Sequence, residues 1–302
     1  MYRPTCRVDG AHSEGIWSVC WKEGKIITGA MDGSCKLWNT SIQKEGEDLL
    51  PKSASANSSK QSFGITSIVA SSDGEFGVNC SQNAVIRFFN LSDMTETGSI
   101  DAGLLEAWTV CLSPGDDMIA TGSHTGNINI WSVAEKAKVC SLVAKGKLIL
   151  STSFNSDGTN IAAGGIDGSL HILDVITQQV IHKIEAHCLP IRKVAYSADG
   201  GLIFTASDDR HVSVFDARSG LAINSFSHSG MALGLDLSPD RRHFAVGCSD
   251  HVVAYWDLGM QRCVHRFDAP HTEQVWDVAF HSSGKKFVTV GEEGILQVFE
   301  SS

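Results

Sequence analysis

Short apolar runs alternate with turn residues along the whole chain. The stretch 12–38 shows the unit, with apolar runs at 16–21, 25–29 and 34–38 and its sharpest turn at Asp32-Gly33. Apolar alternation over four to eight residues, bounded by Gly, Asp, Ser and Pro, predicts β-strands joined by tight turns. A fourth, more polar strand is expected between the end of one unit and the start of the next.

The unit returns six more times, and an apolar residue, mostly aromatic, closes each copy. These closing positions are Trp38, Phe89, Trp131, Leu173, Phe215, Trp256 and Phe299. After a first interval of 51 residues they recur every 41 to 43 residues. Such a period predicts four-stranded β-propeller blades. We expect an all-β, seven-bladed propeller that forms one domain over 1–302, with residues 5–9 supplying the strand that the last blade lacks.

The closing position is often followed by Asp, as at Asp174, Asp216 and Asp257. With the repeat length and the turn pattern, this makes the chain resemble the WD-repeat (WD40) family over essentially its whole length. The resemblance implies a ring of blades that binds protein partners and carries no catalytic site.

Each unit also contains a recurring set of His, hydroxyl, acid and closing aromatic residues. The clearest sets are His12, Thr28, Asp32 and Trp38; His187, Thr205, Asp209 and Phe215; and His271, Thr289, Glu293 and Phe299. In the sixth unit, Val246 replaces the hydroxyl among His228, Asp250 and Trp256. The set could be taken for a hydrolase triad, but an active site has no reason to recur in one chain. We interpret it as the structural tetrad of the WD-repeat family, a buried hydrogen-bond network within each blade.

Units two, three and four depart from this set and should depend more on apolar packing. Their corresponding residues are Gln61, Asn79, Asn83 and Phe89; Gly103, Thr121, Thr125 and Trp131; and Lys145, Ala163, Asp167 and Leu173.

Charge, apolar stretches, cysteine spacing and motifs argue against several classes of function. The formal net charge of −10 and the lack of basic runs argue against direct nucleic-acid binding. No apolar stretch is long enough to span a membrane, and no secretory signal is visible. The nine cysteines include no C-x-x-C pair, which favours packing roles and a reducing compartment over disulfides or zinc. No motif for a metal, a cofactor or a catalytic nucleophile is present, so we expect a non-enzyme.

A Ser-rich insertion at 41–62 lengthens the first blade and could be a regulatory loop or only a tolerated one.

One position per unit carries the functional prediction. The residue five after the His should lie where the first strand starts at the rim of the central channel, and it reads Trp17, Thr66, Trp108, Leu150, Arg192, Leu233 and Trp276. Three of the seven tryptophans occupy this position, although Thr and Arg also do. We predict that the partner-binding surface consists of Trp17, Trp108, Leu150, Arg192, Leu233 and Trp276; the alternative is that the indoles only plug the channel. Glu14, Glu106 and Glu273 could make the rim acidic, or serve only solubility.

Four segments, 11–19, 99–131, 186–200 and 271–280, are similar to a narrower group. They resemble the small WD-repeat subunits of the superkiller (Ski) complex, which animals share with the Paf transcription-elongation complex. This resemblance implies a monomeric propeller within a hetero-complex of the nucleus and cytoplasm. It also implies partners: the tetratricopeptide-repeat subunit of the Ski complex, in exosome-dependent mRNA decay, and the Paf complex subunits. The competing interpretations are an adaptor that reads histone tails or degrons, and a propeller hydrolase whose site the sequence does not reveal.

Overall fold

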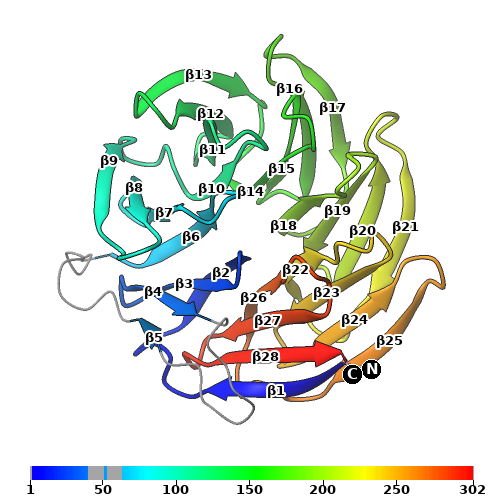
Figure 1. Ribbon diagram of the computed structural model, residues 1–302. Helices are drawn as coiled ribbons and strands as arrows, with labels where there is room; N and C mark the ends of the chain where they lie inside the picture. Colours follow the sequence, from blue (N-terminus) through cyan, green and yellow to red (C-terminus); the bar gives the residue numbers. More distant parts are fainter. Residues whose placement is uncertain (1, 40–50, 53–62, 302) are drawn as a thin grey trace.

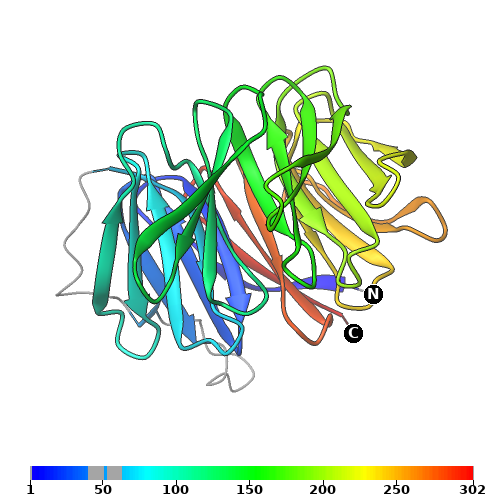
Figure 2. The ribbon, with the colours of Figure 1, turned by 90° about the horizontal axis from the view of Figure 1, so that it is seen from above.

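Seven four-stranded antiparallel sheets form a ring around a central channel in the computed structural model (Figures 1 and 2). The structure describes residues 2–39, 51–52 and 63–301. These residues form strands and turns, with no helix among them. The chain is therefore the all-β, seven-bladed propeller that the period predicts.

Blades are numbered in chain order, and in blades 1 to 6 the four strands follow one another from the channel outward. Blade 1 contains β2 (Ile16–Lys22), β3 (Lys25–Ala30), β4 (Cys35–Asn39) and β5 (Pro51–Lys52). Blade 2 contains β6 (Ile65–Ala70), β7 (Phe76–Ser81), β8 (Val85–Asn90) and β9 (Glu96–Asp101). Blade 3 contains β10 (Thr109–Leu112), β11 (Met118–Gly122), β12 (Asn127–Ser132) and β13 (Ala137–Val143).

The second half of the ring has the same order. Blade 4 contains β14 (Ile149–Phe154), β15 (Asn160–Gly165), β16 (Ser169–Asp174) and β17 (Val180–Glu185). Blade 5 contains β18 (Ile191–Tyr196), β19 (Leu202–Ser207), β20 (His211–Asp216) and β21 (Ala222–Ser227). Blade 6 contains β22 (Ala232–Leu237), β23 (His243–Cys248), β24 (Val253–Asp257) and β25 (Arg262–Phe267).

Blade 7 joins the two ends of the chain. Its inner strands are β26 (Val275–Phe280), β27 (Lys286–Gly291) and β28 (Leu296–Ser301), and its outer strand is β1 (Tyr2–Val8). β1 pairs antiparallel with β28, from Tyr2 opposite Ser301 to Val8 opposite Leu296. The predicted closure of the last blade by an N-terminal strand is confirmed, and that strand begins three residues before the expected position 5.

The core lies between neighbouring blades. Ile26 and Trp38 of blade 1, for example, belong to one buried cluster with Val288 and Leu296 of blade 7. The second strand of each blade has neighbours on both faces, so it is apolar almost without alternation. In β3, Ile26, Ile27 and Ala30 are fully buried.

The recurring His sets form buried hydrogen-bond networks in blades 1, 5 and 7. In blade 5, His187 contacts Asp209 through Nδ1 (2.8 Å) and Thr205 through Nε2 (2.8 Å). In blade 7, His271 makes the corresponding contacts with Glu293 (2.6 Å) and Thr289 (2.7 Å). Phe215 and Phe299, at the closing positions of these two blades, pack as buried apolar residues.

Blade 1 contains the full network with one change. Thr28 Oγ1 contacts His12 Nε2 at 2.7 Å and accepts a hydrogen bond from Trp38 Nε1 at 2.9 Å. His12 Nδ1, however, is 3.6 Å from Asp32 and only 2.7 Å from Ser34 Oγ, which donates to Asp32 at 2.5 Å. Ser34 therefore relays the contact between the His and the acid.

Blade 6 does not form the network that its residues suggest, and the prediction is wrong there. Val246 supplies no hydroxyl, so the buried atoms His228 Nε2 and Trp256 Nε1 have no hydrogen-bond partner among the described residues. Asp250 accepts a hydrogen bond from Ser229 instead of from His228. The His228 ring lies edge-on against the Trp256 indole, with ring centroids 5.2 Å apart.

The departing blades retain parts of the pattern. In blade 3, Trp131 Nε1 donates to Thr121 Oγ1 at 2.9 Å, as in blade 1. In blade 4, His171 comes from β16 and contacts Ser169 at 2.9 Å, and Ser169 donates to Asp167. A histidine from a different strand thus takes part in the network of blade 4, which the spacing of the sequence did not suggest.

Three further sequence predictions concern the cysteines, membrane-spanning segments and the Ser-rich insertion. All nine cysteines are free. Within the described residues, no helix has the length and apolar character needed to cross a membrane. The insertion predicted at 41–62 lies outside the described residues except for 51–52, which pair with Leu37 and Trp38 as strand β5.

Candidate functional site

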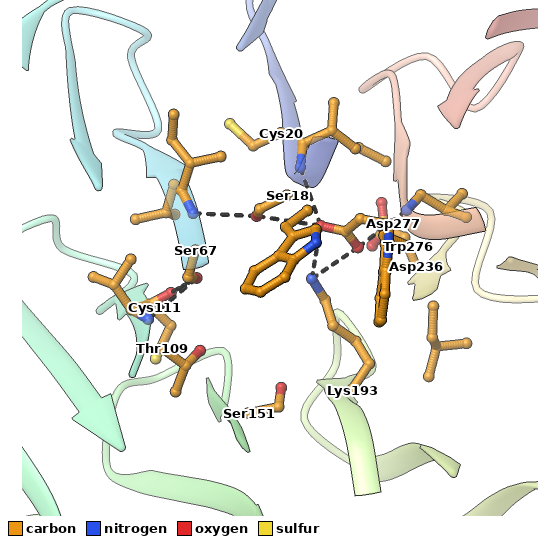
Figure 3. Close-up of a pocket in the computed structure, with 18 of the residues that line it drawn as sticks. Ser18, Cys20, Ser67, Thr109, Cys111, Ser151, Lys193, Asp236, Trp276 and Asp277 are labelled. Carbon is orange, nitrogen blue, oxygen red and sulfur yellow. Dashed lines mark hydrogen bonds and ion pairs between the residues drawn. The ribbon is translucent and has the colours of Figure 1, made fainter. Parts of the chain in front are cut away.

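The channel mouth brings together all seven residues of the predicted rim position. They line one cavity of about 370 Å³, whose deeper wall is formed by the first strands of the blades (Figure 3). The rim residues in this cavity are Trp17, Thr66, Trp108, Leu150, Arg192, Leu233 and Trp276.

A β-bulge sets the direction of these side chains. In blade 1, Ile16 pairs with Ala30 and Ser18 with Gly29, so Trp17 is the extra residue of the bulge. The register shifts in the same way around the rim residues of blades 2, 4, 5, 6 and 7. In blade 3, Trp108 lies directly before β10, and its amide donates to the carbonyl of Gly122. Bulges redirect a side chain out of the regular alternation, which explains why one position per blade lies at the rim.

Three indoles from blades 7, 1 and 3 form a continuous aromatic group at the rim. The ring centroids of Trp17 and Trp276 are 5.8 Å apart, and those of Trp17 and Trp108 are 6.5 Å apart. All three side chains are half-buried. Trp276 Nε1 donates to Glu292, whereas Trp17 Nε1 is buried without a hydrogen-bond partner among the described residues. A buried indole N–H normally finds an acceptor, so Trp17 retains an unused donor.

The other predicted contact residues differ in what they offer to a partner. Leu150 is half-buried at the rim. Arg192 makes two hydrogen bonds to the Asp208 carboxylate, at 2.9 and 2.7 Å, which fix its guanidinium in place. Leu233 is only 4% exposed. It forms part of the cavity wall and has little exposed surface; its contact with a partner stays a prediction.

The acidic residues of the rim also differ in their exposure and in their contacts. Glu14 and Glu273 are exposed. Glu106 instead accepts a hydrogen bond from Asn129 at 2.8 Å and lies 3.9 Å from Lys138. Glu292, which sequence reasoning did not single out, contacts Trp276 directly. Its only sequence signal is a second acid next to Glu293.

Below the rim, serines that follow the bulges of blades 1, 2 and 4 connect each of these blades to the next. Ser18 accepts a hydrogen bond from the amide of Ile68 (3.1 Å), and Ser67 accepts one from Val110 (3.2 Å). Ser151 of blade 4 accepts one from Val194 of blade 5 in the same way (3.0 Å). These bonds satisfy backbone amides that face the channel and hold the first strands in a fixed arrangement.

Blades 5 and 7 are linked directly by an ion pair across the channel wall. Lys193 Nζ lies 2.9 and 3.1 Å from the two carboxylate oxygens of Asp277 (Figure 3). Asp277 also accepts a hydrogen bond from the amide of Val19 in blade 1 (3.1 Å). Although burial acts to lower it, the pKa of Lys193 is raised by this carboxylate. The sequence pattern did not reveal this pair, because the two residues are 84 positions apart.

Asp236 adds a second carboxylate to the channel. It accepts hydrogen bonds from the amides of Phe280 (2.6 Å) and Leu237 (2.9 Å). Burial raises the pKa of Asp236 to about 6, and those amides and Lys193 act in the opposite direction. The lining of the cavity therefore combines apolar side chains with two acids, Asp236 and Asp277, and two lysines, Lys22 and Lys193.

A seven-bladed ring with an aromatic rim defines a propeller of the protein-binding class. The repeat family described as WD domain, G-beta repeat matches residues 4–39, 178–216, 221–257 and 261–300. The family described as the anaphase-promoting complex subunit 4 WD40 domain matches residues 110–190. The chain belongs to the WD-repeat family.

Relatives that match between 63% and 99% of the chain agree with this assignment. WD repeat-containing protein SL1-17 of Schistosoma mansoni is 32% identical over 99% of both chains. Meiotic recombination protein rec14 of Schizosaccharomyces pombe is 25% identical over 70% of this chain and 69% of its own length. WD repeat-containing protein VIP3 of Arabidopsis thaliana is 26% identical over 63% of each chain.

The family also bears on whether the protein is an enzyme. WD-repeat propellers are generally non-enzymatic scaffolds, and neither matching family is one of enzymes. Over residues 2–39, 51–52 and 63–301, no group of three or more His, Cys, Asp and Glu side chains could hold a metal ion. The WD-repeat propeller fold itself implies protein partners.

Proposed function

We propose that this protein is a docking subunit of multi-protein complexes and that it binds its partner through the aromatic rim. In finer terms, we propose the Ski complex, with its tetratricopeptide-repeat subunit as partner, and the Paf complex. The support for these two complexes is the resemblance of 11–19, 99–131, 186–200 and 271–280 to their WD-repeat subunit. Roles in exosome-dependent mRNA decay and in transcription elongation, and a location in nucleus and cytoplasm, follow from the same proposal.

The grouping of Trp17, Trp108 and Trp276 carries the docking proposal. The fold accepts Thr66 and Arg192 at the same bulge position, so it does not require Trp in blades 1, 3 and 7. Tryptophan and arginine are the residues most enriched at interface hot spots. The fixed Arg192 guanidinium adds a directional contact to this apolar surface.

The test is co-purification with the tetratricopeptide-repeat subunit. Trp17→Glu and Trp276→Glu should each abolish it, because a carboxylate replaces an indole at the centre of the contact. Circular dichroism and the melting temperature should stay close to those of the wild type, since both side chains lie outside the blade cores. Thr97→Glu, at an exposed position of β9, is the matched control and should still bind. Undiminished binding by both tryptophan variants would refute the rim assignment.

A second candidate function is supported by the cavity below the indoles. Asp236 and Asp277 line it. Asp277 is already paired with Lys193, whereas Asp236 accepts hydrogen bonds from backbone amides, so a cationic side chain that passes between the tryptophans would meet the Asp236 carboxylate. An adaptor that reads histone tails or degrons could use such a pocket. Micromolar binding of free histone-tail peptides by the isolated protein, lost in Asp236→Asn, would favour this function over a subunit that binds only within its complex.

A further inference from the structure

A second position in each blade lies next to the rim position. It belongs to the turn between the second and third strands, and in blades 1, 2, 4, 5, 6 and 7 its amide donates to the carbonyl two residues before the rim residue. These turn residues are Met31, Gln82, Ile166, Asp208, Ser249 and Glu292. In blade 3 the amide of His124 donates to the carbonyl of Leu105, three residues before the rim residue. The backbone thus ties each turn to the segment that carries a rim side chain.

In blades 3 and 5 the side chain of the turn residue contacts the rim side chain. Asp208 accepts two hydrogen bonds from the Arg192 guanidinium. The His124 ring lies edge-on against the Trp108 indole, with ring centroids 5.6 Å apart. The two members of each pair are 16 positions apart in the chain. The turn residue therefore suits the rim residue beside it, a carboxylate for a guanidinium and a ring for a ring.

Glu292 occupies this turn position in blade 7 and contacts the segments that carry two rim tryptophans. Its carboxylate accepts a hydrogen bond from Trp276 Nε1, and its amide donates to the carbonyl of Gln274 at 2.9 Å. On its other side the carboxylate packs against Gly15, two residues before Trp17, where an added Cβ would lie 2.6 Å from Oε2. Glu292 therefore fills the space between the segments of blades 7 and 1 that carry the adjoining indoles.

Trp17 is oriented by its aromatic neighbours. The turn residue of blade 1 is Met31, whose sulfur accepts a contact from Gln82 Nε2 at 3.6 Å, and Trp17 Nε1 has no hydrogen-bond partner among the described residues. The Trp17 indole packs against Trp276 at 52° between the ring planes and against Trp108 at 46°. Its orientation thus depends on where Trp276 is held.

We propose that Glu292 is a positioning residue of the aromatic rim, which holds the Trp276 indole, and through it Trp17, in the arrangement that a partner meets. This role rests on the proposed docking function of the rim. A side chain that is fixed before binding does not have to be ordered on binding, which removes an entropy cost. The competing role is a direct contact between Glu292 and a cationic partner, and that role requires the charge of the carboxylate and not its position.

Circular dichroism of the free protein tests the positioning without a partner. Two indoles that touch at a fixed tilt couple their electronic transitions and give a signed couplet in the far ultraviolet, and the difference between the wild type and Trp276→Phe isolates the couplet of the Trp17–Trp276 pair. Glu292→Ala should remove most of this couplet. Glu292→Gln should retain it, because the amide oxygen still accepts from the indole N–H.

A second variant moves the carboxylate and keeps its charge. In Gly15→Ala the added methyl group occupies the place of the Glu292 carboxylate, so this variant should lose the couplet as Glu292→Ala does. Glu273→Ala is the matched control, because it removes an exposed acid of the same rim, and it should leave the couplet unchanged.

Titration with the tetratricopeptide-repeat subunit gives the effect on binding. Glu292→Ala and Gly15→Ala should each weaken binding about fivefold, the cost of ordering a freed side chain on binding, whereas Glu292→Gln should bind like the wild type. An unchanged couplet in Glu292→Ala would overturn the proposal. So would a Glu292→Gln variant that keeps the couplet but binds as weakly as Glu292→Ala, because the partner would then recognise the charge.

Trp276→Glu separates this proposal from the docking function on which it rests. If Trp276→Glu abolishes binding while Glu292→Ala loses the couplet and binds normally, the proposal is wrong, since the rim does not have to be arranged in advance. Undiminished binding by Trp276→Glu would refute the docking function of the rim. The couplet of the free protein distinguishes that failure from a failure of Glu292 to position the indoles.

Discussion

At the scale of single residues, one missing hydroxyl distinguishes blade 6 from blade 1. Val246 pairs with Leu235 in the register in which Thr28 pairs with Val19. In blade 1 that hydroxyl bridges a His ring and an indole N–H, whereas His228 Nε2 and Trp256 Nε1 remain buried and unpaired. Val246→Thr should supply the missing partner. We expect the free energy of unfolding to rise by about 1 kcal/mol, the net value of a typical buried hydrogen bond.

The matched control is the reverse change in blade 7. Thr289→Val removes the hydroxyl that contacts His271 and should cost about 1–3 kcal/mol, since it leaves a buried ring nitrogen unsatisfied. Urea unfolding of both variants and the wild type gives the comparison. If Val246→Thr destabilises the protein while Thr289→Val does so as expected, the two unpaired atoms of blade 6 are not arranged around a common hydroxyl position.

The same histidine predicts a pH dependence of stability. Burial lowers the pKa of His228 from 6.5 to about 4. The folded protein therefore holds neutral His228, and its contribution is full above pH 6.5 and is lost as the pH falls towards 4. Between about pH 7 and pH 5 the loss from this residue is about 2 kcal/mol. Asp236 acts in the opposite sense, because its pKa is raised from 3.8 to about 6 and acidification over that range favours the folded form.

His228→Gln isolates the contribution of this histidine to the pH dependence of the free energy of unfolding. Urea unfolding at about pH 7 and about pH 5 should show a smaller loss of stability for this variant than for the wild type, whatever its absolute stability. Equal losses in both proteins would show that His228 titrates normally in the folded state.

At the scale of strands, β1 is the element on which blade 7 depends. It covers the outer edge of β28, and Tyr2 adds a hydrogen bond from its hydroxyl to the carbonyl of Gly284. Deleting residues 1–8 would expose the edge of β28, and a free edge strand invites pairing with other chains. We expect a lower melting temperature and aggregation on heating, measured by calorimetry and light scattering. Adding a synthetic peptide of residues 1–8 should restore part of the stability. A deletion variant that melts like the wild type would contradict this role of β1.

Strand order and blade number are the part of the structure that the sequence predicts well, because contacts within a blade repeat with the blade. The interval between Trp131 and Leu173, for example, fixes four strands even though blade 4 lacks the complete His set. The bulge at Trp17 and the relay through Ser34 are harder to predict, since each depends on local backbone geometry that one sequence position does not encode. The histidine of blade 4 was missed for a related reason: His171 belongs to β16 and not to the loop that supplies His187.

At the scale of the whole ring, closure depends on contacts that do not repeat. Serines connect blade 1 to 2, blade 2 to 3 and blade 4 to 5, but blade 6 has Gly234 at this position. A Cβ there would lie 2.7 Å from the Cα of Asp277, so blades 6 and 7 approach too closely for a side chain. Instead of a serine of blade 6, Lys193 of blade 5 reaches blade 7, where it forms an ion pair with Asp277. A repeat-based interpretation could not find this pair, because it links two different residue types in two different blades.

The Lys193–Asp277 pair should therefore be worth more to the ring than a surface ion pair. Asp277 is 2% exposed at its side chain and Lys193 is 34% exposed, so water screens the lysine only in part. Lys193→Met leaves a buried carboxylate that still accepts from the amide of Val19, and we expect a loss of about 2 kcal/mol, below the 3–5 kcal/mol of a fully buried pair. Asp277→Asn should cost a similar amount, and the double variant less than the sum of the two. Urea unfolding of the four proteins gives the coupling energy in a double-mutant cycle. A coupling energy of about 1 kcal/mol or more would show that the two residues stabilise the ring as a pair. Additive losses would show that each residue supports its own blade alone. Lys286→Met, which breaks the exposed pair with Glu300, is the control and should change stability by less than about 1 kcal/mol.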